Sequence, residues 1–163
     1  PRKEADKIGN VDIFLDEKHV FDFGDEKAKV LETPGHTLGG ICLYYPKSKV
    51  LFSGDTIFSL GCGRLFEGTP DMMWESFQKI LALPDETWIY PGHEYTKANA
   101  KFCLTHDPDN KDLIERNKEI DMARGENLPT IPVSLGMEKK TNIFLRAQSA
   151  KEFAKLRAAK DNA

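Results

Sequence analysis

The sequence has few cysteines, few histidines and no long apolar run. Its three cysteines form no Cys-x-x-Cys pair, and their odd number argues against a disulfide framework. No apolar stretch approaches the ~20 residues that a membrane-spanning helix needs. The formal net charge of -3 gives no reason to expect binding to nucleic acid. We therefore expect a protein of the reducing cytoplasm with no membrane and no nucleic-acid partner.

The composition is that of a soluble globular protein. With 40% hydrophobic and 30% charged residues, the 163-residue chain can form one domain, or one and a half, with a normal core. Short β-rich runs separated by Gly24-Asp25 and by Pro46–Lys49 predict two hairpins, and their apolar character predicts a sheet covered on both faces. The expected strands are 11–15, 20–23, 28–32, 41–45, 50–53 and 88–90.

Helix signals lie between and after these strands. Thr69 followed by Pro70 predicts a helix start, and its expected buried stripe is Met73, Phe77, Ile80 and Leu81. Together with the strands on either side, this helix predicts a strand–helix–strand unit. Further helices are expected over 96–106, over 108–124 with Asp107 as cap, and after the capping-box pattern at 149–152. The predicted organisation is an α/β section over residues 1–103 and a helical section over 104–163.

Three predicted strands end in a glycine-containing turn that carries a possible metal ligand. His36 follows Thr-Pro-Gly, Asp55 follows Phe-Ser-Gly, and His93 follows Tyr-Pro-Gly. A lone histidine or a Gly-Asp-Thr turn usually has no function, but three such strand ends are harder to explain as ordinary turns. Imidazole and carboxylate groups suit zinc, iron or manganese. The pattern predicts a metal site at His36, Asp55 and His93.

At these residues the sequence resembles a known family. The motifs are Thr-Pro-Gly-His-Thr, Ser-Gly-Asp-Thr, Gly-Cys-Gly-Arg-Leu-Phe-Glu-Gly and Gly-His-Glu-Tyr-Thr. Together they resemble glyoxalase II, the hydroxyacylglutathione hydrolase branch of the metallo-β-lactamase superfamily. The resemblance implies the second half of an αββα metallo-β-lactamase sandwich, followed by a helical glutathione-binding domain.

The resemblance also implies roles for individual residues. His36 would hold a first metal ion and His93 a second, with the Asp55 carboxylate bridging two zinc ions, or iron or manganese. Arg64, Tyr95 and Arg146 match family positions that contact glutathione, although Arg64 and Arg146 taken singly could be ordinary surface arginines. Phe66 stands in the substrate loop where many relatives have a tyrosine, so one hydroxyl contact would be lost.

One family feature is absent from the sequence. The family carries a His-x-His-x-Asp-His run that supplies most ligands of a two-metal centre, whereas the four histidines here are widely separated. The chain also begins at Pro1. We expect the sequence to be the C-terminal portion of a longer enzyme, which alone could be inactive because the missing half is needed to complete the site.

The predicted activity is hydrolysis of the thioester of S-(2-hydroxyacyl)glutathione, most simply S-D-lactoylglutathione, to glutathione and D-lactate in methylglyoxal detoxification. Two alternatives remain open. One is a non-catalytic glutathione-binding fragment, and the other is an iron enzyme similar to persulfide dioxygenases, a branch that usually lacks the helical C-terminal section. The sequence does not specify the metal, the acyl-group preference or the oligomeric state.

Overall fold

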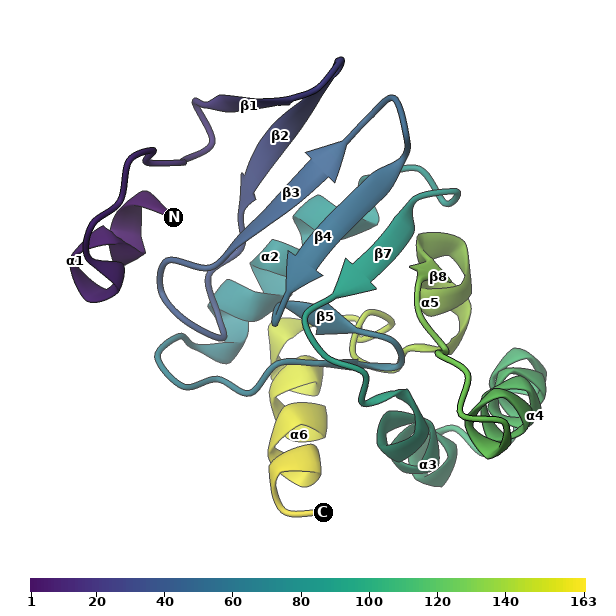
Figure 1. Ribbon diagram of the computed structural model, residues 1–163. Helices are drawn as coiled ribbons and strands as arrows, with labels where there is room; N and C mark the ends of the chain where they lie inside the picture. The colour runs from purple at the N-terminus through teal and green to yellow at the C-terminus, as the bar shows by residue number, and fades with distance from the viewer.

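A mixed six-stranded sheet forms the centre of the protein (Figure 1). The computed structural model describes residues 1–163. Strand order is β1-β2-β3-β4-β7-β8; β4 and β7 are parallel and the other neighbours antiparallel. Both predicted hairpins, β1–β2 and β3–β4, are confirmed. The strands are β1 Val20–Phe23, β2 Glu26–Glu32, β3 Ile41–Tyr45, β4 Val50–Gly54, β7 Trp88–Pro91 and β8 Val133–Ser134.

The helices follow the predicted order, with additions. Helix α2 connects β4 to the parallel strand β7, which confirms the strand–helix–strand unit. It begins as predicted, because the Thr69 hydroxyl accepts the Met72 backbone N–H at 3.3 Å. The helical segments are η1 Arg2–Glu4, α1 Ala5–Ile8, α2 Pro70–Leu81, α3 Thr96–His106, α4 Lys111–Gly125, α5 Leu135–Thr141 and α6 Ala150–Asp161. A small separate hairpin pairs β5 Ile57–Phe58 with β6 Gly61–Cys62.

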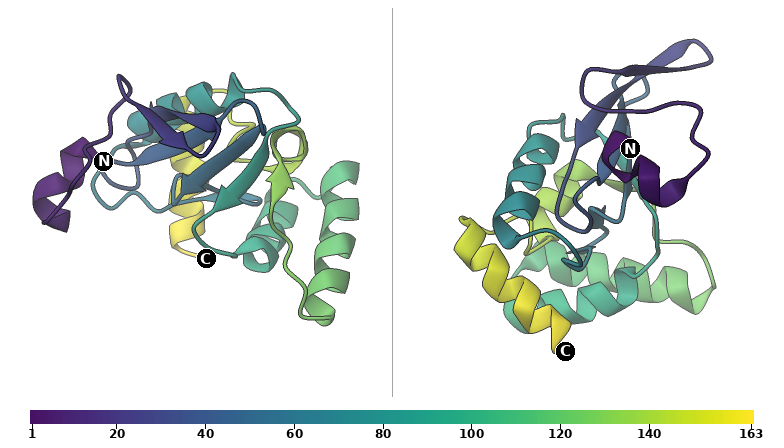
Figure 2. Two further views of the ribbon diagram at one scale, coloured as in Figure 1. Left: turned by 45° about the horizontal axis from the view of Figure 1, so that its top comes forward. Right: turned by 90° about the vertical axis from the view of Figure 1, so that its left-hand side faces the viewer.

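The hydrophobic core joins one face of the sheet to buried residues of helices α2 to α6 (Figure 2). Leu51 of β4 and Ile89 of β7 are fully buried on this face. Phe77 of α2 and Phe153 of α6 are also fully buried, with ring centroids 5.4 Å apart in an edge-to-face arrangement. The core therefore joins the C-terminal helix to the sheet.

The opposite face of the sheet is largely open in this chain, so the expectation of a sheet covered on both faces is wrong here. Phe52, Trp88 and Tyr90 lie on this face and are 48%, 48% and 40% exposed. Phe52 and Tyr90 contact each other, with ring centroids 5.5 Å apart. Three neighbouring aromatic side chains thus form an exposed apolar patch, of a kind that usually marks a packing surface.

Several local expectations need correction. The predicted strand at 11–15 does not form, because this segment has no neighbouring strand with which to pair. The predicted helix over 108–124 begins at Lys111, because the Asn110 side chain, and not Asp107, accepts the Leu113 N–H. Strand β8, helix α5 and the β5–β6 hairpin were not predicted. No helix has the length and apolar character needed to cross a membrane.

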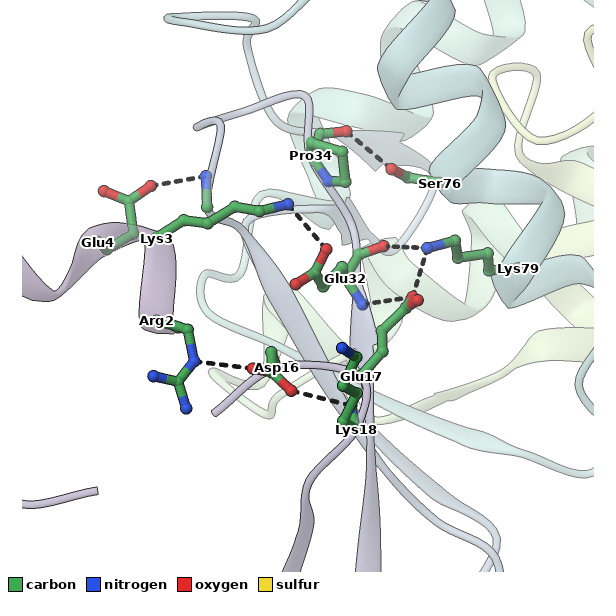
Figure 3. A network of polar contacts seen from close by, with 11 residues as sticks. Arg2, Lys3, Glu4, Asp16, Glu17, Lys18, Glu32, Pro34, Ser76 and Lys79 are labelled. Atoms are coloured by element: carbon green, nitrogen blue, oxygen red, sulfur yellow. Dashed lines mark hydrogen bonds and ion pairs between the residues drawn. The ribbon is translucent and has the colours of Figure 1, made fainter. Parts of the chain in front are cut away.

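Polar contacts attach the N-terminal segment to the body of the protein (Figure 3). Lys3 pairs with Glu32 of β2 at 2.8 Å, and Glu4 accepts the Gly39 N–H at 2.8 Å. Lys79 of α2 donates to the Glu32 carbonyl at 2.8 Å and also pairs with Glu17. Exposed ion pairs contribute little individually, but this set brings the first helical turns beside the loop that follows β2.

Candidate active site

The structure brings the three predicted strand ends together. His36 lies in the loop after β2, Asp55 follows β4, and His93 follows β7. The two oxygens of the Asp55 carboxylate face different imidazoles: Oδ2 lies 3.4 Å from His36 Nε2, and Oδ1 lies 3.5 Å from His93 Nε2. Because β4 and β7 are parallel neighbours, their carboxyl ends fall at the same edge of the sheet. This arrangement places Asp55 between the two imidazoles.

Buried hydroxyl groups fix the turn that carries Asp55. The Thr33 and Thr56 hydroxyls lie 2.9 Å apart, and both side chains are buried. This hydrogen bond joins the segment leading to His36 to the turn after β4. In the same turn Ser53 Oγ donates to the Ile57 carbonyl at 2.9 Å. Asp55 is therefore held by a satisfied polar network, which gives a rigid support for a functional side chain.

The orientation of His36 depends on the loop that carries Arg64. His36 Nδ1 lies 2.8 Å from the Arg64 carbonyl oxygen, which can only accept, so Nδ1 carries a proton, and in the neutral imidazole Nε2 is then the nitrogen with the lone pair. The Phe66 N–H in turn donates to the His36 carbonyl at 3.2 Å. Gly63 allows this close approach, because a Cβ there would lie 3.1 Å from His36 Nδ1 and would clash with the Asp55 carbonyl.

His93 is held by backbone pairing and aromatic contacts. The Gly92 N–H donates to the Gly54 carbonyl at 2.8 Å, and a Cβ at Gly92 would lie only 2.8 Å from Asp55 Oδ1. The His93 ring stacks on Tyr95 with centroids 5.1 Å apart and an interplanar angle of 16°. Phe58 packs edge-on against both rings. These contacts leave Nε2 of His93 directed at Asp55.

The possible metal donors form two pairs, each with one imidazole nitrogen and one Asp55 oxygen. The structure contains no group of three or more His, Cys, Asp and Glu side chains arranged around a single ion position. Instead, each imidazole nitrogen faces its own oxygen of Asp55. Each pair offers two possible ligands for a metal ion. Four ligands are usual for zinc, so each position would need further donors.

A cavity of about 510 Å³ opens at these three side chains. Its wall includes the rings of Phe58, Phe66 and Tyr95. Phe66 lies 5.0 Å from the His36 ring, and Tyr95 stacks on His93. The structure therefore places the predicted residues Phe66 and Tyr95 beside the two imidazoles.

Three cations line the same cavity, of which only Arg64 was predicted. Arg157 and Lys160 come from α6, within the basic stretch over residues 139–163. Asp161 lies 2.8 Å from Arg157 and 3.7 Å from Arg64. The Lys160 amine donates to the Ala98 carbonyl at 3.3 Å and lies 4.8 Å from the Phe102 ring centroid, and burial lowers its pKa. A partly buried amine without a counter-ion suits an anionic ligand.

Arg146 does not reach this cavity. Its guanidinium pairs with Asp107, and it lines a smaller hollow that includes His106 and Leu156. The sequence alone could not show which of Arg146 and Arg157 lines the cavity, because both are arginines in the same basic stretch. The spacing of Arg157 and Lys160, one helical turn apart, was the available signal for a shared face.

The cavity thiol is not an activated nucleophile. Cys62 lines the cavity, yet burial raises its pKa to about 11. The three cysteines are free and buried. Because the thiolate is the reactive form, a protonated Cys62 has a structural role at neutral pH.

Comparison with known families agrees with this fold. A sequence model described as the metallo-β-lactamase superfamily matches residues 2–93, and one described as the hydroxyacylglutathione hydrolase C-terminus matches residues 94–163. The chain is therefore a metallo-β-lactamase superfamily protein with a second, helical part.

Two relatives narrow the class. A hydroxyacylglutathione hydrolase of Rhizobium meliloti is 47% identical over 99% of this chain and 69% of its own length. One of Pelagibacter ubique is 48% identical over 98% of this chain and 66% of its own length. The chain belongs to the hydroxyacylglutathione hydrolase family, and it spans about two thirds of the length of these relatives.

Solved structures share the fold. ETHE1 from Myxococcus xanthus superimposes with a TM-score of 0.64 over 91% of this chain and 52% of its own, at 23% identity. A metallo-β-lactamase from Staphylococcus aureus gives a TM-score of 0.60 over 91% of this chain and 43% of its own, at 25% identity. The chain thus covers about half of each of these structures.

Proposed function

We propose that this chain carries the glutathione-binding wall and part of the metal centre of a hydroxyacylglutathione hydrolase. In that role it would take part in hydrolysis of S-D-lactoylglutathione to glutathione and D-lactate. One observation carries the proposal: His36, Asp55 and His93 share a cavity with Arg64, Arg157 and Lys160. The set combines possible metal donors with cations suited to the carboxylates of the tripeptide.

The metal centre would use the donors already described. His36, Asp55 and His93 would hold the zinc ions. Zinc bound there would supply Lewis acidity toward a thioester carbonyl and toward water. The residues of this chain fix where that chemistry occurs. His36 Nδ1 keeps its proton and donates it in a hydrogen bond to the Arg64 carbonyl, so Nε2 is the nitrogen that faces the metal position. Iron or manganese would suit the same donors.

The rest of the cavity would bind and orient the substrate. Lys160 and Arg157 would attract a glutathione carboxylate, and Arg64 a second anionic group. The aromatic rings of Tyr95 and Phe58 would border the acyl-thioester region near His93. A thiolate is a weakly basic leaving group, with a parent pKa near ~8.5, so a dedicated general acid is less necessary than for an amide.

The ligand count supports a contribution from outside the 163 residues. Two imidazoles and one carboxylate cannot complete two tetrahedral shells. The exposed aromatic patch of Phe52, Trp88 and Tyr90 offers an apolar surface against which such a segment could pack. We place the division between the two functional parts near residues 103–104, and the free thiols agree with a cytoplasmic location.

The test measures two properties separately. Calorimetric titration should show that the zinc-loaded chain binds glutathione, while hydrolysis of S-D-lactoylglutathione stays at the level of the His36→Ala variant. Fusion of a preceding family segment containing the His-x-His-x-Asp-His run should restore hydrolysis, and His36→Ala should abolish it. Absence of glutathione binding, or equal activity of the fused His36→Ala variant, would contradict the proposal.

A further inference from the structure

The β5–β6 hairpin, residues 57–62, is the part of the cavity wall that the C-terminal helices hold most extensively. Phe58 and Cys62 line the cavity. Phe58 packs edge-on against Tyr95 at 5.3 Å and against His93 at 6.1 Å, measured between ring centroids. Any displacement of this hairpin therefore moves a ring that contacts a predicted metal ligand.

Side chains from helices α3 and α6, and from Asn142 after α5, contact every backbone carbonyl from Phe58 to Cys62. The Asn142 amide, just after α5, donates to Phe58 and Gly61 at 3.4 and 3.1 Å. The other three carbonyls, of Ser59, Leu60 and Cys62, accept from Asn99 and Cys103 of α3 and from Arg157 of α6. The hairpin is thus attached to these helices, and no other strand pairs with it in a ladder.

Glu138 of α5 is the buried centre of this attachment. It is fully buried and accepts the Leu60 N–H at 2.8 Å, the Asn142 amide at 2.8 Å and the Ser59 hydroxyl at 3.2 Å. Leu60 itself is fully buried with a φ of 58°, in the left-handed region that leucine rarely adopts. A strained residue persists only where its surroundings hold it, and the Glu138 carboxyl is the group that holds the Leu60 N–H.

We propose that Glu138 and Asn142 are positioning residues, which hold the 57–62 hairpin so that Phe58 stays against Tyr95 and His93. The C-terminal helical part would then shape the cavity as well as line it. The claim that the cavity binds glutathione rests on the proposed function. The claim that Glu138 and Asn142 position the hairpin does not depend on it.

The site of Glu138 makes this positioning sensitive to pH. Burial raises the pKa of Glu138 to about 7, against the opposing effect of its three hydrogen-bond donors. The titratable groups facing it are Arg116 of α4 and Cys103 of α3. Strand β8 and the two contacting hairpin residues, Ser59 and Leu60, carry no charge. Because the enclosed Glu138 carboxyl holds its proton more tightly than a solvent-exposed one, the attached position of the hairpin is most stable below pH 4.5, where the carboxyl is protonated in both states. The attachment weakens as the pH rises from 4.5 to about 7.

The experiment uses the full 163-residue chain and the variants Glu138→Ala, Glu138→Gln, Asn142→Ala and Thr141→Val. Thr141 is a matched control, because it is equally buried on α5 but its hydroxyl bonds to the Met137 carbonyl and not to the hairpin. The readouts are hydrogen exchange of the Leu60 amide, the nuclear Overhauser contact between Phe58 and Tyr95, and the glutathione dissociation constant.

Glu138→Ala and Asn142→Ala should lower Leu60 protection by about tenfold or more, weaken the Phe58–Tyr95 contact and raise the glutathione dissociation constant, because buried partners lose their hydrogen bonds. Thr141→Val should leave the Leu60 protection, the Phe58–Tyr95 contact and the glutathione dissociation constant unchanged. In the unmodified chain, Leu60 protection corrected for intrinsic exchange should fall on the order of a hundredfold between pH 4.5 and about 7. Glu138→Gln, which keeps the side-chain volume, should abolish that pH dependence.

Unchanged Leu60 protection and an unchanged Phe58–Tyr95 contact in Glu138→Ala and Asn142→Ala would overturn the proposal. If these two variants do not fold, the same pH dependence in Glu138→Gln as in the unmodified chain would overturn it. If the unmodified chain fails to bind glutathione, the proposed function is contradicted. The hydrogen exchange of Leu60 and the Phe58–Tyr95 contact then still decide whether Glu138 and Asn142 position the hairpin.

Discussion

His36 donates its Nδ1 proton to the Arg64 carbonyl oxygen across 2.8 Å. A single loop therefore orients a predicted metal ligand with its backbone and places a cationic side chain in the cavity. The Gly-Cys-Gly-Arg sequence links the metal centre to substrate binding through this bond, since the ring could not keep its orientation if the loop moved. Hydrogen bonds to the second nitrogen of a ligating imidazole commonly tune metal affinity.

Substitution Gly63→Ala should weaken zinc binding about 10- to 100-fold, because the added Cβ would clash with the Asp55 carbonyl and crowd His36 Nδ1. Titration against a chromophoric zinc chelator measures the effect. Gly125→Ala is the matched control, since a Cβ there meets no atom within 4 Å. Equal zinc affinity of Gly63→Ala and the unmodified chain would show that the loop does not position His36.

Substitution Lys160→Met should raise the glutathione dissociation constant about tenfold or more, since a hydrogen bond to a charged group is lost in a partly buried site. Arg146→Met should leave it unchanged, because Arg146 pairs with Asp107 outside the cavity. Calorimetric titration of both variants compares the two directly. A larger loss for Arg146→Met would favour the assignment made from sequence alone.

The sequence specified those parts of the site that depend on local patterns. His36, Asp55 and His93 each follow a short apolar strand and a glycine, so their placement at one sheet edge could be predicted once the strands were located. The family motif also placed Arg64, Phe66 and Tyr95 at the cavity. The start of α2 was equally predictable, because Thr69 and Pro70 act within one helical turn.

Contacts between distant segments were beyond such patterns. Glu138 and Leu60 are 78 residues apart, and Arg157 and Cys62 are 95 residues apart. The four-residue β5–β6 pairing and the short helix α5 are stabilised mainly by these contacts and not by propensity. The segment 11–15 has the apolar residues of a strand but no neighbouring strand to pair with, and it does not form one. Here too the contacts between distant segments decide the structure.

Substitution Glu138→Gln should change how stability depends on pH. Because the folded-state pKa of Glu138 is raised to about 7, its contribution to the free energy of unfolding is fully present below pH 4.5 and is lost as the pH rises to about 7. The total change across this window is roughly 3 kcal/mol.

Urea unfolding at a series of pH values measures this change as the stability difference between the variant and the unmodified chain. Glutamine does not ionise, so this difference should grow in favour of the variant as the pH rises. Glu115→Gln on exposed α4 surface is the control. A difference that does not vary with pH would show that Glu138 ionises as it does in the unfolded chain.

Substitution Phe153→Ala should lower the free energy of unfolding by about 3–5 kcal/mol, because it leaves a cavity where α6 packs on Phe77. Since α6 also carries Arg157 and Lys160, glutathione affinity should fall with it. Urea unfolding and calorimetric titration test the two effects together. Met122→Ala on α4 is the control, because Met122 is 71% exposed. Full glutathione affinity in a folded but destabilised Phe153→Ala variant would show that α6 holds its cations in place without this core contact.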